Sequence, residues 1–182
     1  MELASQQMLP VAQPQAWDAL NDIELLKQAI PGCESMTATS EFQYELVVTA
    51  AIGPVKARFK SKLTLSDVQA PNSYTMQFDG QGGPAGFGKG TAKVRLSPAD
   101  GGNTLLNYTV NAQVGGKIAQ VGSRLVDMAA QKMAKDFFVN FEKAISAKYA
   151  PPAPPEAPAA AVARPSLIAR LWAALRGLFS AK

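Results

Sequence analysis

The sequence contains no histidine and only one cysteine, Cys33, among its 182 residues. Histidine is the only side chain whose ordinary pKa lies near neutrality, so its absence removes the commonest general base and the usual activator of a cysteine nucleophile. A single cysteine excludes an internal disulfide, and a cysteine-based zinc site lacks its ligands. We therefore predict no metal site and no catalytic residues, and we interpret Cys33 as a small, half-buried thiol.

Long apolar runs are also missing. No uncharged segment approaches the roughly 20 residues of a membrane-spanning helix. The segment Met1–Ser5 lacks the basic stretch and apolar run of a secretory signal. We therefore expect a cytoplasmic protein. Because 47% of the residues are hydrophobic, the chain can still bury a sizeable core.

The net charge of +4 is unevenly distributed along the chain. All 14 acidic residues lie at or before Glu156, whereas Arg164, Arg170, Arg176 and Lys182 follow without an acidic neighbour. The whole net charge therefore belongs to residues 164–182. A neutral body with a basic tail argues against nucleic-acid binding and indicates an anionic surface contacted by the tail.

Apolar residues alternate with polar ones over several long segments. The clearest are 42–50, 55–65, 74–78, 92–96 and 106–112, with turn residues at Gly53–Pro54, Pro71–Asn72 and 100–103. Alternation of this kind predicts about six or seven antiparallel strands with one solvated face. A further strand over 3–11 and two short helices precede them. The first helix spans Pro14–Leu20, and the second is capped by Asn21 or Asp22 and ends at Pro31–Gly32.

The apolar period changes to that of a helix from about Lys117 to Tyr149. The expected stripe consists of Ile118, Val121, Leu125, Met128, Ala129, Met133, Phe137, Phe141 and Ile145. Its repeat is slightly longer than the 3.6 residues of an ideal helix, so the stripe winds around the helix axis. This predicts one long helix that bends near Ala129–Met133 around a curved sheet.

Two further segments follow this predicted domain, which spans residues 1–149. Residues 150–165 hold six prolines and are mostly alanine otherwise, which predicts a semi-rigid spacer of about 50 Å at full extension. We predict that residues 166–182 form an amphipathic helix, whose apolar arc and flanking arginines suit the plane of lipid headgroups. We expect a peripheral membrane anchor formed by Leu167, Ile168, Arg170, Leu171, Trp172, Leu175, Arg176, Leu178 and Phe179. The alternatives are a groove on a partner protein and docking onto its own domain.

Two other features have ordinary structural explanations. The segment Gly83–Gly90 nearly matches the phosphate-binding motif GxxxxGK followed by serine or threonine. However, Gly90 replaces the required hydroxyl residue, and a strand is expected to follow instead of a helix. We predict a flexible hairpin loop that is able to cover a cavity through Phe87. Lys56, Arg58, Lys60 and Lys62 form a basic stripe on one strand face, which indicates an exposed face or a docking surface for an acidic partner.

Several segments resemble a known family. They are Ile30–Glu34, Gly53–Phe59, Gly88–Ala92 and, most specifically, Gly115–Arg124. With the order of elements, they make residues 1–149 similar to the carbon monoxide dehydrogenase G-subunit family of the START-like (SRPBCC) superfamily. The resemblance implies an α+β helix-grip fold, in which a curved antiparallel sheet wraps around a long C-terminal helix. It also implies a cavity and association with molybdenum hydroxylases of the carbon monoxide dehydrogenase type at the cytoplasmic membrane.

Strand parity and the helical stripe predict which side chains line this cavity. We expect Leu26, Phe59, Leu63, Met76, Phe78, Val94, Tyr108, Val110, Val121, Leu125, Met128 and Ala129. The alternative is that the same side chains simply fill a core.

Three functions agree with these patterns. The first is a non-enzymatic carrier of a lipophilic molecule, best a respiratory quinone (menaquinone or ubiquinone), with no covalent cofactor. Tyr108 or Tyr44 would donate to a quinone carbonyl. The second is a membrane recruitment or assembly factor for the hydroxylase without ligand transport. The third, a cyclase- or hydrolase-like enzyme, is disfavoured because histidine is absent and no carboxylate lies on the inward strand faces.

Overall fold

The computed structural model describes residues 1–149, and the predictions for residues 150–165 and 166–182 lie outside this range. Within it, no helix is both long and apolar enough to cross a bilayer. The strands are β1 (Glu2–Leu9), β2 (Cys33–Ser40), β3 (Gln43–Ile52), β4 (Val55–Gln69), β5 (Ser73–Gln81), β6 (Phe87–Ala99) and β7 (Asn103–Gly115). The helices are α1 (Gln13–Leu20), α2 (Ile23–Ala29), α3 (Lys117–Gln120) and α4 (Ser123–Tyr149), with short 3-10 turns at Gly83–Ala85 and Asp100–Gly102.

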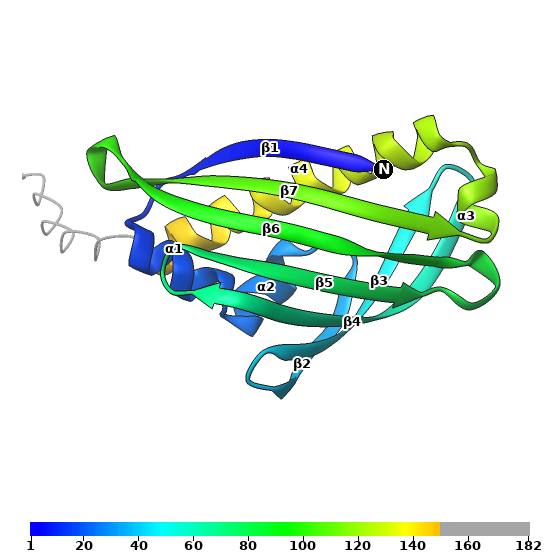
Figure 1. Ribbon diagram of the computed structural model, residues 1–182, viewed down its shortest axis with the longest axis horizontal. Helices are drawn as coiled ribbons and strands as arrows, with labels where there is room; N and C mark the ends of the chain where they lie inside the picture. Colours follow the sequence, from blue (N-terminus) through cyan, green and yellow to red (C-terminus); the bar gives the residue numbers. More distant parts are fainter. Residues whose placement is uncertain (150–182) are drawn as a thin grey trace, which may run out of the picture. The chain divides into compact units, whose positions relative to one another are not determined.

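All seven strands form one antiparallel sheet in the order β1-β7-β6-β5-β4-β3-β2. The strands from β2 to β7 are joined as successive hairpins, and β1 closes the other edge by pairing with β7. The helices lie on one face of the curved sheet (Figure 1). In that view α1 and α2 lie at one end of α4, and α3 lies at the other. The predicted helix-grip architecture is confirmed.

The two short helices begin where the sequence predicts. The carboxylate of Asp22 accepts hydrogen bonds from the backbone N–H groups of Glu24 and Leu25, so it caps α2. The prediction of one helix from about Lys117 was wrong at its start. Gly122 has a φ of 96°, a conformation that favours glycine, and it separates the single turn α3 from α4.

The predicted hairpin loop connects β5 to β6; its base is tightly packed, whereas Gly83 and Pro84 at its tip are exposed. The N–H of Gly82 donates to the carbonyl of Gly86, and Ala85 is buried. A Cβ placed on Gly86 would lie only 1.9 Å from the carbonyl oxygen of Gly115, so the two backbones are in direct contact. Phe87 begins β6 and its ring lies over Gly115. This loop therefore closes one end of the sheet against the β7–α3 connection.

The hydrophobic core is divided into two clusters. One joins α1, α2 and the C-terminal half of α4 to the sheet through residues such as Leu20, Leu106, Phe141 and Ile145. The other consists of Met36, Tyr44, Leu46 and Val48 on β2 and β3. No residue of α4 before Phe137 belongs to either cluster. The first half of the long helix thus covers the sheet without filling the space beneath it.

Candidate functional site: an apolar cavity between sheet and helix

A cavity of about 500 Å³ lies between the sheet and the helices. Its walls come from β3 to β7, from α2 and from the inner side of α4. Volumes of about 300–1,000 Å³ with mostly apolar walls are typical of small-molecule sites. The cavity therefore has the size and lining of a site for a lipophilic ligand.

The cavity exists because small residues occupy inward positions where large ones would fill a core. Gly80 and Gly88 pair near the end of β5 and the start of β6 and leave this part of the sheet without side chains. A Cβ on Gly88 would meet only one atom within 4 Å, Cγ1 of Val114, at 3.9 Å. Ala129, Ala130 and Ala134 form the opposing surface of α4. The space between these two surfaces is left open.

Partial exposure of inward-facing side chains is a second sign of the cavity. On β4 the inward residues from Val55 to Leu65, Phe59 and Leu63 among them, are all half-buried, although a helix covers this face. Met76 and Phe78 on β5 show the same partial exposure. In a packed core such side chains have almost no surface that a water-sized probe can reach. Their exposure is therefore toward the cavity.

Most of the predicted lining residues surround the cavity in the structure. These are Leu26, Phe59, Leu63, Met76, Phe78, Val94, Tyr108, Val110 and Ala129. Strand parity located all of them except Leu26 and Ala129, because alternate residues of a strand face opposite sides of the sheet. Whether a ligand occupies the space stays a prediction.

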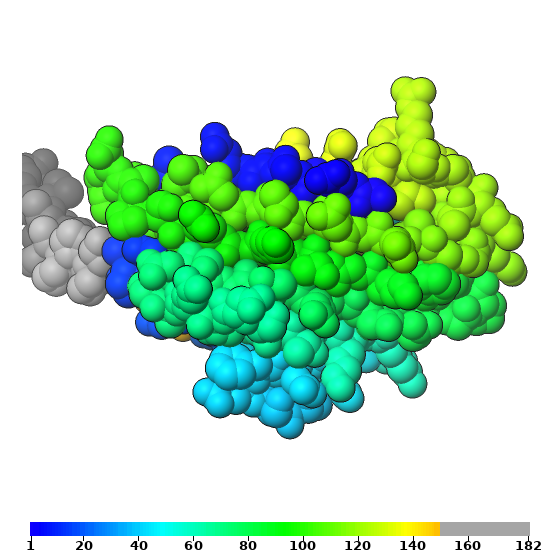
Figure 2. All heavy atoms as spheres, viewed as in Figure 1, coloured from blue at the N-terminus to red at the C-terminus, as the bar shows by residue number. Residues whose placement is uncertain are grey.

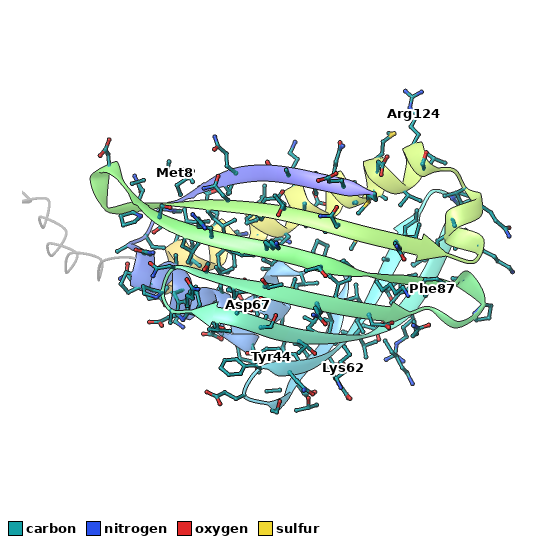
Figure 3. The ribbon with its side chains drawn as sticks, in the orientation of Figure 1. Met8, Tyr44, Lys62, Asp67, Phe87 and Arg124 are labelled. Atoms are coloured by element: carbon teal, nitrogen blue, oxygen red, sulfur yellow. The ribbon has the colours of Figure 1, made fainter. Side chains whose placement is uncertain are left out.

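The prediction was wrong for Val121, Leu125 and Met128, which do not line the cavity. Leu125 and Met128 are 41% and 56% exposed. Val121 and Leu125 lie instead near Gly53 at the turn between β3 and β4. Their neighbour Arg124 projects away from the domain in the first turn of α4 (Figure 3). The error arose from following the largest apolar side chains, whereas the inward face of this half of the helix is rich in alanine.

Sequence reasoning missed several residues that do line the cavity. Val126, Ala130, Met133, Ala134, Phe137 and Phe138 form the α4 wall, and Tyr74 lies on β5. Positions 126, 130, 133, 137 and 141 repeat with the helical spacing of three and four residues, which is the signal that would have located this face. Tyr74 has the same parity as Met76 and Phe78, so strand parity is the signal that would have identified it.

Hydroxyl groups are the polar side-chain atoms around the cavity. They belong to Tyr44, Ser61, Tyr74 and Tyr108. Burial, and secondarily the nearby Tyr44, raises the pKa of Tyr74 above its ordinary value, so this phenol stays protonated at physiological pH. Among residues 1–149 no three potential metal ligands come together. The site can therefore donate hydrogen bonds to an apolar molecule.

The opposite face of the sheet is polar. Figure 2 shows this outer face, where the strands lie in front of much of α4 and the beginning of α4 appears at the upper edge. The side chains of the predicted basic stripe are exposed there, and Arg58 forms an ion pair with Glu34 at 2.6 Å. Lys62 lies between Glu45 and Asp79 of the neighbouring strands. Two hollows on this face are lined largely by polar and charged side chains, so they differ in chemistry from the cavity.

Solved structures with the same architecture include a START superfamily protein, so the chain shares the helix-grip fold of that class. A conserved protein from Geobacillus kaustophilus is 29% identical, covers 81% of this chain and 97% of its own, and superposes with a TM-score of 0.77. A START superfamily protein from Mycobacterium smegmatis is 14% identical, with 81% and 98% covered and a TM-score of 0.63. The Zhui aromatase/cyclase from Streptomyces sp. R1128 is 10% identical, with 82% and 96% covered and a TM-score of 0.61.

The chain belongs to the CoxG family, that of the carbon monoxide dehydrogenase G-subunit, whose profile matches residues 8–146. A comparison with curated proteins finds no match. The family name connects the family with carbon monoxide dehydrogenase, and the similar solved structures show its fold. The same fold occurs in the aromatase/cyclase, so the fold alone does not separate binding from catalysis.

Proposed function

We propose that this protein is a non-enzymatic carrier of a lipophilic molecule, best a respiratory quinone, between the cytoplasmic membrane and a molybdenum hydroxylase of the carbon monoxide dehydrogenase type. The observation that carries the proposal is the apolar cavity of about 500 Å³ between the sheet and α4. A site with apolar walls and a few hydroxyl donors suits a neutral molecule with a carbonyl group.

The choice of a quinone follows from the chemistry of the partner. A hydroxylase that oxidises its substrate must pass electrons to an acceptor, and quinones are apolar acceptors that reside in the bilayer. The CoxG family name supports a hydroxylase of the carbon monoxide dehydrogenase type as the partner. The amphipathic segment 166–182 supports a peripheral position on the inner face of the cytoplasmic membrane, since its apolar arc and arginines suit an anionic lipid surface.

Filling the cavity tests this proposal. In Gly88→Leu the new side chain enters open space, and the residue does not have the positive φ that only glycine tolerates well. We expect the thermal midpoint to stay within a few degrees of the parent value. Binding of a short-chain ubiquinone analogue or of menadione should fall at least about tenfold, because the leucine occupies ligand space. Calorimetric titration and a thermal melt measure the two effects.

Gln77→Leu provides the matched control, because it adds the same side chain to the exposed outer face of β5. This variant should bind as the parent does. A parent that shows no saturable binding, together with a Gly88→Leu protein destabilised by about 1–3 kcal/mol as an overpacked core would be, would contradict the carrier. The recruitment or assembly factor without ligand transport would then be the function.

A further inference from the structure

The cavity wall carries hydroxyl groups but no charged side chain. The amino group of Met1, a residue at the cavity border, donates to the carbonyl of Ala112 at 3.0 Å. A carboxylate or phosphate placed inside would therefore lose its water without gaining a charged side-chain partner. Burying an ion in this way is far more costly than burying a neutral carbonyl or hydroxyl group.

Two of the hydroxyl groups are distinguished by their burial. Tyr44 on β3 and Tyr74 on β5 are each only 9% exposed and both line the cavity. Within residues 1–149 neither hydroxyl forms a hydrogen bond with another group of the protein, although buried polar atoms nearly always find a partner. No fully enclosed side-chain oxygen of these residues is left unsatisfied, so each of the two hydroxyl oxygens keeps some accessible surface.

The surroundings hold these two rings in position. The Trp17 ring meets that of Tyr74 edge-on, with centroids 5.8 Å apart and an interplanar angle of 75°. Tyr44 packs with Met36, Leu46 and Val48 in the smaller core cluster. The two hydroxyls belong to strands separated by β4, and they are close enough for a charge on Tyr44 to raise the pKa of Tyr74. Packing therefore holds both rings in place, and the raised pKa keeps Tyr74 protonated as a donor.

We propose that Tyr44 and Tyr74 together form the polar anchor of the site, which accepts neutral lipophiles through a carbonyl or hydroxyl oxygen and rejects lipids with an anionic headgroup. This inference rests on the proposed carrier function, since it assumes that the cavity holds a ligand. It assigns a ligand-binding role to Tyr74, which sequence reasoning did not single out. It also specifies that the bound molecule carries no charge. Tyr108 differs because it is less buried and its ring lies against Phe138, with centroids 5.2 Å apart.

The test compares two probes that differ only in their headgroup, 1-dodecanol and dodecanoate, both below their aggregation limits at pH 8. The full chain is titrated with each, and the Gly88→Leu protein reports any binding outside the cavity. We expect the parent to bind dodecanol at least about tenfold more tightly than dodecanoate. Replacing both tyrosines, as Tyr44→Phe with Tyr74→Phe, should weaken dodecanol binding by about five- to tenfold.

Tyr149→Phe is the matched control, because it removes a hydroxyl from the end of α4 outside the cavity and should leave binding unchanged. Thermal melts should show that both tyrosine variants, the double variant and the control, are folded, since each substitution keeps the ring. Equal affinity for the two probes would overturn the inference, and so would a double variant that binds dodecanol as the parent does. A parent that binds neither dodecanol nor the quinone analogue would instead overturn the carrier function.

Discussion

At the scale of single residues, Thr104 holds the corner where β1 leads into α1. It is completely buried on β7, and its hydroxyl donates to the backbone carbonyl of Val11 at 2.7 Å. Val11 itself belongs to the larger core cluster. The chain leaves the sheet at Val11, so its carbonyl has no partner strand and lies in apolar surroundings. The Thr104 hydroxyl therefore supplies the hydrogen bond that this carbonyl needs.

Thr104→Val should lower the free energy of unfolding by about 1–3 kcal/mol, because it leaves the carbonyl of Val11 without this donor. Thr104→Ser keeps the hydroxyl and should cost less than the valine variant. Urea denaturation of both proteins measures the difference. A valine variant as stable as the parent would show that another group satisfies the carbonyl.

At the residue scale, the glycine and alanine residues that line the cavity are the ones that the sequence predicts least well. The glycine-rich pattern around Gly88 predicts a loop, although this residue occupies an inward position of β6. Small residues contribute little to a search for apolar side chains, yet their lack of volume is what leaves the cavity open. Large inward residues such as Phe59 and Phe78 were predicted correctly because strand parity alone decides their direction.

At the scale of elements, Asp22 links α2 to the end of α4. Its carboxylate caps α2 and also accepts a hydrogen bond from the Lys148 ammonium at 2.6 Å. The bond to Lys148, followed by the backbone N–H groups of Leu25 and Glu24, holds the pKa of Asp22 below its ordinary value against the opposing effect of burial. The stabilisation that depends on this charge is therefore complete above the ordinary pKa and is lost as the pH falls through the lowered one.

Two substitutions separate the cap from the charge. Asp22→Ala should cost about 1 kcal/mol of stability, because alanine cannot cap the helix. Asp22→Asn can still cap and should cost less at neutral pH. Its deficit relative to the parent should stay constant above about pH 5 and begin to shrink below about pH 3.9, where the carboxylate of the unfolded chain becomes protonated, until the native carboxylate is protonated at lower pH. Denaturation curves across this range measure the effect, and a deficit independent of pH would exclude a contribution from the charge.

The long helix shows why the extent of an element is easier to predict than which of its faces packs toward the sheet. The apolar period located α4 up to Tyr149, but it included the separate turn α3, because the effect of Gly122 at a positive φ is not part of a hydrophobic repeat. The predicted face was displaced toward Leu125 and Met128, since a search for large residues favours leucine and methionine over Ala130 and Ala134. A helix above a cavity presents small residues inward and leaves some large ones exposed.

At the scale of the whole molecule, the proposed function needs both the cavity and the amphipathic segment. Deletion of residues 166–182 should leave the domain folded and abolish binding to anionic liposomes, because the apolar arc and the basic residues of the tail are removed together. Trp172→Glu should weaken binding strongly, and Arg170→Ala with Arg176→Ala should weaken it by about 1 kcal/mol per charge, less at high salt. Liposome sedimentation measures each effect. Unchanged sedimentation of the shortened protein would exclude the segment as the anchor.

The central claim is that the space between the sheet and α4 holds a neutral lipophile in the cell. Native mass spectrometry of the full chain, purified from its own membranes beside Gly88→Leu, tests it most directly. We predict that the parent carries one bound molecule with the mass of an isoprenoid quinone and that Gly88→Leu carries none. An empty parent, or the same bound mass in equal amount on Gly88→Leu, would contradict the claim.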